Sequence, residues 1–135
     1  MLEAYSTNIE VAQNSAIPFN NVSIEKGCTT SLNAPGTVFL NKKGVYMVSV
    51  DAAAAPSEAG IVSIQLYKDG TPQPQAQSAV TGTTSTVDNI SFVTLVQAKE
   101  DNTCNCCTTP TTIKVMNTGE DSTFTVANIC VTKIC

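Results

Sequence analysis

Three cysteines fall within four consecutive positions of this sequence, in the stretch TCNCCTTP at residues 103–110. Cys104, Cys106 and Cys107 are of a type and spacing that could do chemistry, because thiolates bind soft metals, attack electrophiles and exchange disulfides. The chain has six cysteines in all and no histidine. The other three are Cys28, Cys130 and Cys135. A metal site, a redox centre and a disulfide staple are the candidate roles.

The spacing within the cluster disfavours a metal site and a redox centre. Zinc knuckles usually place two to four residues between their cysteines. Cys104 and Cys106 are closer than that, Cys106 and Cys107 are adjacent, and a site without histidine would need four thiolates. A thioredoxin-like centre needs Cys-x-x-Cys at a helix N-terminus. Cys104 and Cys107 have that spacing, but Thr-Thr-Pro follows them and no helix is predicted there.

Disulfide bonding is the role that we favour for all six cysteines. The segment Glu100–Pro110 is polar and rich in threonine, so a cross-link would order it. Cys130 and Cys135 could reach this segment if the last predicted strand runs beside it. Six cysteines allow fifteen pairings, and each bridge could add about 2–4 kcal/mol to the free energy of unfolding. Free thiols in a reducing cytosol are the alternative.

No other residues predict catalysis. Ser-His-Asp and Cys-His pairs are impossible without histidine. The acidic residues Asp51, Glu58, Asp69 and Asp88 are scattered, spell out no calcium-binding loop, and are expected to be solvated loop charges. No motif indicates a pair of carboxylates for glycoside hydrolysis. We therefore predict no enzyme activity, no catalytic, cofactor-binding or metal residues, and no cofactor.

The composition of the chain argues against nucleic acids and membranes as binding partners. The chain has 135 residues, enough for one domain with a substantial core. Its net charge is −4 and its seven basic residues are all lysine, so it lacks the basic footprint of a nucleic-acid or membrane-surface protein. No apolar run approaches the roughly 20 residues of a membrane span. The N-terminus does not resemble a secretory signal, which suggests release by lysis or removal of a signal.

The elements that would hold these residues are strands. Residues 44–50 (GVYMVSV) and 61–70 (IVSIQLYKDG) alternate with period two, and Asp69-Gly70 predicts a hairpin turn. Residues 71–80 contain two prolines and should form an edge strand. Residues 87–98 are apolar on both faces, which predicts burial on both sides, and residues 51–60 are expected to be a loop or a strand end. The sequence predicts one all-β domain, a sandwich or a barrel.

The order of four stretches resembles a known family. AIPFNNV, GVYMVSVDAAA, IVSIQLYKDGTPQPQAQS and TVANICVTKI follow one another as in the complement C1q/tumour-necrosis-factor-like jelly roll, over residues 9–134. The likeness is greatest to exosporium glycoprotein domains of spore formers and to modules on phage heads and fibres. It implies a two-sheet, ten-strand sandwich that forms a homotrimer, with a structural or binding role. No collagen-like stalk precedes the domain here, and the CNCC segment is not part of the family pattern.

The resemblance sets further expectations for particular residues. Tyr46, Phe92 and Phe124 are candidates for the trimer axis or, by default, for the core. Residues 1–8 could form an N-terminal docking arm on the single domain 1–135. In a trimer, disulfides between subunits would also be possible.

Three hypotheses for function follow from the resemblance. The leading one is a structural protein on a virion surface, made in the host cytoplasm and released by lysis: a phage capsid decoration or head-fibre protein, with itself and a capsid protein as partners. The second is an adhesin that binds a host-surface glycan through Asp51–Gly60 or Gln73–Gly82, although the absence of tryptophan leaves few platforms for sugars. The third is a spore or cell-surface component of the exosporium or coat.

Overall fold

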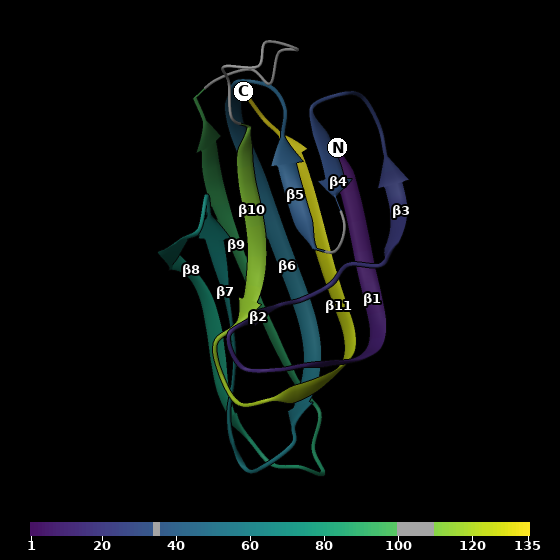
Figure 1. Ribbon diagram of the computed structural model, residues 1–135, viewed down its shortest axis with the longest axis vertical. Helices are drawn as coiled ribbons and strands as arrows, with labels where there is room; N and C mark the ends of the chain where they lie inside the picture. The colour runs from purple at the N-terminus through teal and green to yellow at the C-terminus, as the bar shows by residue number, and fades with distance from the viewer. Residues whose placement is uncertain (34–35, 100–109) are drawn as a thin grey trace.

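The computed structural model describes residues 1–33, 36–99 and 110–135, and every regular element in them is a β-strand. The strands form two antiparallel sheets (Figure 1). The first sheet has the order β3 (Asn21–Glu25), β1 (Leu2–Val11), β11 (Ser122–Lys133), β6 (Gly44–Pro56), β9 (Asp88–Ala98). The second has the order β4 (Thr30–Asn33), β5 (Thr37–Leu40), β10 (Thr111–Asn117), β7 (Gly60–Lys68), β8 (Thr71–Gly82), with β2 (Ser15–Ala16) also beside β10.

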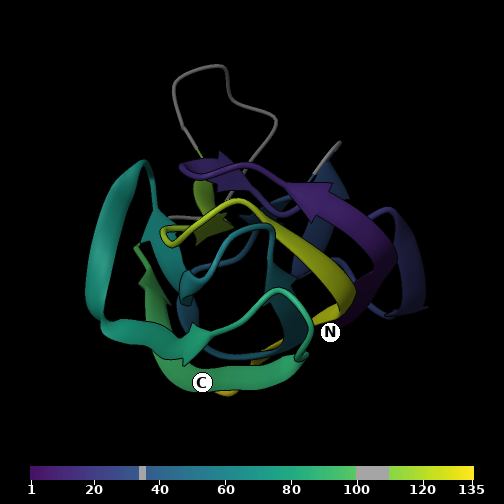
Figure 2. The same cartoon turned by 90° about the horizontal axis from the view of Figure 1, so that it is seen from below.

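One apolar core lies between the two sheets, which face each other when the molecule is viewed along its length (Figure 2). It follows from the period-two pattern, because alternate side chains of each strand point inward. In β7, for example, Val62, Ile64 and Leu66 are fully buried. Each such aliphatic side chain contributes about 1.5–3 kcal/mol when it leaves water. The predicted all-β sandwich with a single core is therefore present.

The hairpin between β7 and β8 forms where the sequence predicts it. Asp69 and Gly70 both have positive φ, 49° and 81°, as a tight turn of this type requires. The Asp69 carboxylate also accepts a hydrogen bond of 2.8 Å from the Thr112 amide, which ties the turn to β10. β8 is the edge strand of its sheet, so Pro72 and Pro74 interrupt no inner ladder.

Strand β6 extends beyond the period-two stretch at residues 44–50. Of the two possibilities for residues 51–60, a loop or a strand end, the structure shows a strand end as far as Pro56. Its flanking strands β11 and β9 both pair with it here, and Ala52 and Ala54 point into the core. Alanine has little intrinsic preference for strands, but a central position with partners on both sides overrides that preference.

The N-terminal residues form no separate arm. Leu2–Val11 is strand β1, and it pairs with β11 on one side and with β3 on the other. Leu2 and Ala4 are fully buried, and the Met1 ammonium donates a 2.8 Å hydrogen bond to the Lys26 carbonyl. The expectation of a docking arm at residues 1–8 was wrong because the alternating apolar residues of this segment complete the core.

Strand β9 is not buried on both sides within one chain, contrary to our expectation for residues 87–98. It forms an edge of the first sheet, and its burial alternates strictly. Phe92 and Val96 face the core, whereas Val93 and Leu95 face outward and are 64% and 58% exposed. Nothing in the described chain covers the outer side of this strand.

Candidate functional site

The cysteines are the first candidates, and only three of them can be placed. Cys104, Cys106 and Cys107 lie outside the described residues, so their predicted disulfides stay a prediction. Among the described residues, Cys28, Cys130 and Cys135 carry free thiols. No group of three or more metal-ligating side chains is assembled in the parts of the chain that the structure describes.

The last strand does not run beside the strands that flank residues 100–109. The neighbours of β11 are β1 and β6, and β6 separates it from β9. Cys135 nevertheless lies at the end of the sandwich where β9 stops. Ala98 pairs with Gly44, and the adjacent Val45 amide donates a 3.2 Å hydrogen bond to the carbonyl of Cys135. A disulfide between Cys135 and the cysteines at 104–107 stays a prediction, because those three cysteines lie outside the described residues.

Cys130 has a different environment, on the outward face of β11. Its thiol donates to the Glu3 carboxylate at 3.5 Å, and the other oxygen of that carboxylate accepts a 2.8 Å hydrogen bond from Ser23. Partial burial, reinforced by the negative charges of Glu3 and Asp51, raises the pKa of the Cys130 thiol. A thiol held protonated is a poor nucleophile, so this cysteine does not have the character of a redox centre.

The three aromatic candidates lie between the sheets. Tyr46 and Phe124 are fully buried and Phe92 is 8% exposed. The Tyr46 hydroxyl donates to the Lys42 carbonyl at 2.7 Å, which fixes the turn between β5 and β6. Of the two roles that we considered for these aromatics, the trimer axis and the core, all three lie in the core of this chain. The outward faces of the sheets therefore consist of other side chains.

The outward face of the first sheet carries apolar residues, several of them on the strand that the sequence marks as apolar on both faces. Leu95 of β9 lies beside Met47 of β6, and Val93 lies beside Ser49. Met47 is 41% exposed, and Val126 of β11 adds a further outward apolar side chain on the same sheet. We call Met47, Val93, Leu95 and Val126 the apolar face. The signal was present in the sequence, since residues 92–96 (FVTLV) are almost uniformly apolar where a half-exposed strand would alternate.

A polar row crosses the same sheet between Val126 and the other three residues of the apolar face. In register across four strands lie Tyr5, Asn128, Asp51 and Ser91. Asp51 is thus in the middle of a strand on a sheet face, and our expectation of a loop charge was wrong for it. A surface that combines apolar side chains with a few polar groups is typical of protein interfaces, where the polar groups fix the orientation of the partner.

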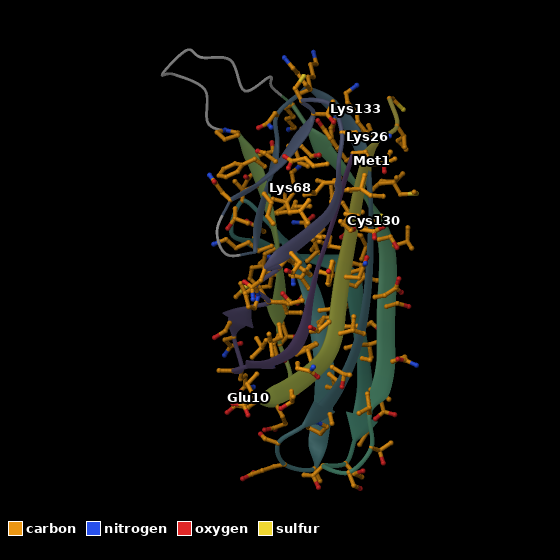
Figure 3. The ribbon with its side chains drawn as sticks, turned by 90° about the vertical axis from the view of Figure 1, so that its right-hand side faces the viewer. Met1, Glu10, Lys26, Lys68, Cys130 and Lys133 are labelled. Atoms are coloured by element: carbon orange, nitrogen blue, oxygen red, sulfur yellow. The ribbon has the colours of Figure 1, made fainter. Side chains whose placement is uncertain are left out.

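The two ends of the sandwich differ in charge. Met1, Lys26 and Lys133 lie toward one end, and Glu10 lies toward the other (Figure 3). The turns at the Glu10 end surround a hollow of about 330 Å³ that Glu10 and Asp121 line. One oxygen of Asp121 already accepts a 2.7 Å hydrogen bond from the Gln13 amide. None of the chain's lysines lies in these turns.

Comparison with solved structures decides the fold. The globular domain of zebrafish complement 1qA matches with a TM-score of 0.67 at 9% identity, over 96% of this chain and 94% of that one. The chain has a C1q/TNF-like jelly-roll fold. The Eiger TNF of S. frugiperda gives a TM-score of 0.71 at 14% identity, over 99% and 92% of the two chains.

The same fold occurs in a virion protein. The vertex protein P5 of PRD1 matches with a TM-score of 0.61 at 12% identity, over 99% of this chain and 96% of that one. No protein-family model and no curated protein matches the chain. At these identities the likeness establishes the jelly roll alone, and the function has to be argued from the surfaces.

Proposed function

We propose that the chain is a non-enzymatic structural protein that assembles as a homotrimer on the surface of a phage particle, as a capsid decoration or head-fibre protein. The observation that carries the proposal is the apolar face of the first sheet. Exposed apolar side chains grouped on one sheet are unusual in a monomer and typical of an interaction surface. The phage vertex protein with the same fold supports a place on a virion.

The strands that carry the apolar face favour a second copy of this chain as its partner. Val93 and Leu95 lie on an edge strand, and Met47 lies on the strand next to it. A closed ring of copies would bury this part of the face on every subunit and leave none exposed, as cyclic symmetry requires. A homotrimer is the arrangement that the family resemblance implies.

Native mass tests the assembly. Light scattering of the purified chain should give three times 14.1 kDa, with and without reductant. A non-reducing gel then tells whether disulfides between subunits contribute, since a covalent trimer would appear there only without reductant. A mass of 14.1 kDa under all conditions would contradict the proposed trimer.

Immunoelectron microscopy tests the place of action. Antibodies against the chain should label the surface of intact particles released by lysis of the cells that produce it. Labelling of spores or of the cell surface instead would favour the exosporium alternative. An adhesin remains the second candidate, and Gln73–Gly82, one of the stretches we expected to carry it, is strand β8 rather than a loop.

A further inference from the structure

The outward face of the second sheet contains a hollow of about 340 Å³. Three features of the chain surround it. β2 has only two residues and pairs with β10 at Met116 and Asn117. β5 pairs with β10 only as far as Ile113, and Gly70 brings no side chain to the neighbouring turn. The residues that line the hollow are Ala16, Tyr67, Gly70, Thr112, Lys114 and Met116.

Lys114 is the one charged residue of the lining. It is exposed, and it is the one lysine of the chain that lies inside a strand rather than in a turn or at a strand end. Its direct neighbour across the β7–β10 ladder is Tyr67, which is half-buried. No hydrogen bond or ion pair holds the Lys114 ammonium among the residues that the structure describes.

Asp69 is next in sequence to Gly70 of the lining, and one oxygen of its carboxylate is already engaged. Asp69 accepts hydrogen bonds from both the amide and the hydroxyl of Thr112, at 2.8 and 3.3 Å. Both hydrogen bonds go to the same oxygen of Asp69, and no ion pair joins this carboxylate to Lys114 in the described part of the chain. The hollow offers one free cation, one aromatic ring and, at Met116 and Ala16, a small apolar floor.

We propose that this hollow binds a carboxylated saccharide unit. An ammonium favours a sugar carboxylate through a charge-assisted hydrogen bond, and the ring of Tyr67 offers the apolar platform on which one face of a pyranose can lie. A nucleic acid would need many cations, and only one lysine lines this site. The site is shallow, so a single unit binds weakly, with a Kd on the order of 1 mM.

This inference goes beyond the structural role and does not require it. The hollow lies on the second sheet, whereas the apolar face lies on the first, so self-association would leave the hollow open. Three copies in one assembly would then multiply a weak affinity for a surface that carries many such sugars. The proposed residues also differ from the stretches 51–60 and 73–82 that the sequence suggested for glycan binding.

Ligand-observed NMR of the full chain tests the proposal. Saturation transfer should appear with 3′-sialyllactose or with a glucuronate-containing oligosaccharide, and not with neutral lactose. Transfer to either acidic sugar supports the site and distinguishes the two sources of the carboxylate. Equal transfer to lactose would overturn the proposal. So would the absence of transfer to all three sugars at a sugar concentration tenfold above the expected Kd of ~1 mM.

Variants then locate the binding. Lys114→Gln should weaken binding roughly tenfold, the usual scale of one charge-assisted hydrogen bond, while Lys114→Arg keeps the charge and retains binding. Lys26→Gln removes the same charge from the β3–β4 turn and serves as the matched control. Unchanged binding in Lys114→Gln, or an equal loss in Lys26→Gln, would show that general charge attraction explains the signal and would refute the site.

Discussion

The outward faces of the two sheets differ although both obey the same alternation. On the first sheet the outward positions of β9 and β6 include Val93, Leu95 and Met47, all more than 40% exposed. On the second sheet the corresponding positions of β7 and β10 are largely polar, such as Gln65 and Lys114. Ile61 is the exposed aliphatic residue of β7.

This difference supports the proposal that the first sheet faces a partner and the second faces water. Alternation decides which side chains enter the core. The outward side chains are expected to be polar where they stay in contact with water. Glutamine and lysine at the centre of a sheet face are expected where that face stays in contact with water. The uncovered aliphatic residues of the first sheet are consistent with a partner, whereas the second sheet presents the polar side chains of a free surface.

The largest expected effect is on assembly, and it separates the two faces directly. Leu95→Glu should reduce the native mass from three times 14.1 kDa to 14.1 kDa, because a carboxylate would have to be buried without a partner. The matched control is Ile61→Glu, at a residue of similar exposure (53% against 58%) on the other sheet. Light scattering should show that this control stays trimeric.

Two outcomes would break the comparison. If Ile61→Glu dissociates the assembly and Leu95→Glu does not, the partner surface is on the second sheet. If both variants keep the wild-type mass, neither sheet face is the interface. Circular dichroism of both variants checks that the fold survives, which is expected because both side chains are exposed.

A second prediction compares the two sides of β9. Phe92→Ala should lower the free energy of unfolding by about 3–5 kcal/mol, because it removes a core aromatic and leaves a cavity. Leu95→Ala should change the stability of the dissociated chain by only about 0.5 kcal/mol or less, since it lies outside the core. Urea denaturation measures both free energies of unfolding. Phe92→Ala is measured in the dissociated Leu95→Glu background, and Leu95→Ala is measured at a protein concentration low enough to dissociate the assembly. Similar losses at the two positions would mean that β9 does not have this register.

A third prediction concerns the turn that joins the two sheets. Asn117 is fully buried, and its amide donates to the carbonyls of Val11 and Glu120 at 2.9 and 3.0 Å while its oxygen accepts from the Gly119 amide. Asn117→Leu would leave these buried groups without partners and should cost roughly 2–4 kcal/mol of unfolding free energy. Thermal and urea unfolding measure it, with the exposed Asn89→Leu on β9 as the control. A neutral Asn117→Leu would refute this hydrogen-bonded turn.

The smallest effect is the pH dependence of Glu3, which belongs to the first sheet's outward face. The hydrogen bond from Ser23, followed by that from Cys130, lowers the pKa of the Glu3 carboxyl below its usual value. A lowered pKa in the folded state stabilises the fold above the unfolded-state pKa, and that contribution is lost as the pH falls through the folded pKa. Glu3→Gln should therefore be less stable than its parent near neutrality, and the gap should close below about pH 4.3.

Unfolding curves between pH 3 and 7, in the dissociated Leu95→Glu background, would measure this gap without interference from assembly. Ser23→Ala should remove most of it, because the largest cause of the shift is the Ser23 hydroxyl. A gap that does not vary with pH would show that the carboxylate gains nothing from these partners in solution.

Much of the fold could be predicted from local signals. The alternation in residues 44–50 and 61–66, the Asp69-Gly70 turn and the prolines at 72 and 74 each depend on one or two neighbouring residues, and each prediction was confirmed. Local signals were insufficient where distant strands decide the outcome. The sequence left a loop or a strand end open for the alanines at 52–55, and they are in a strand because β9 and β11 flank them. Residues 2–8, expected as an arm, are in a sheet strand because β11 supplies a partner more than a hundred positions away.

For the candidate sites, too, local signals gave the residue types, and distant strand pairing decided which residues meet. The sequence drew attention to the cysteines and to Tyr46, Phe92 and Phe124, because residue type alone marks them. It could not show that these aromatics lie inside the sandwich, or that Leu95 and Met47 meet on the outside. Residues 47 and 95 become neighbours only through the register of β6 with β9, and Tyr67 and Lys114 only through that of β7 with β10.

The sequence by itself determined the all-β class, because backbone periodicity and turn chemistry are properties of adjacent residues, whereas the jelly-roll order came from the resemblance of four stretches to a known family. Composition also determined that histidine-based catalysis is impossible and that a nucleic-acid footprint is missing. Only the tertiary structure decided which apolar residues are left over once the core is full. That remainder depends on which strands lie at an edge and which face is covered, and both are set by pairing between residues far apart in the chain.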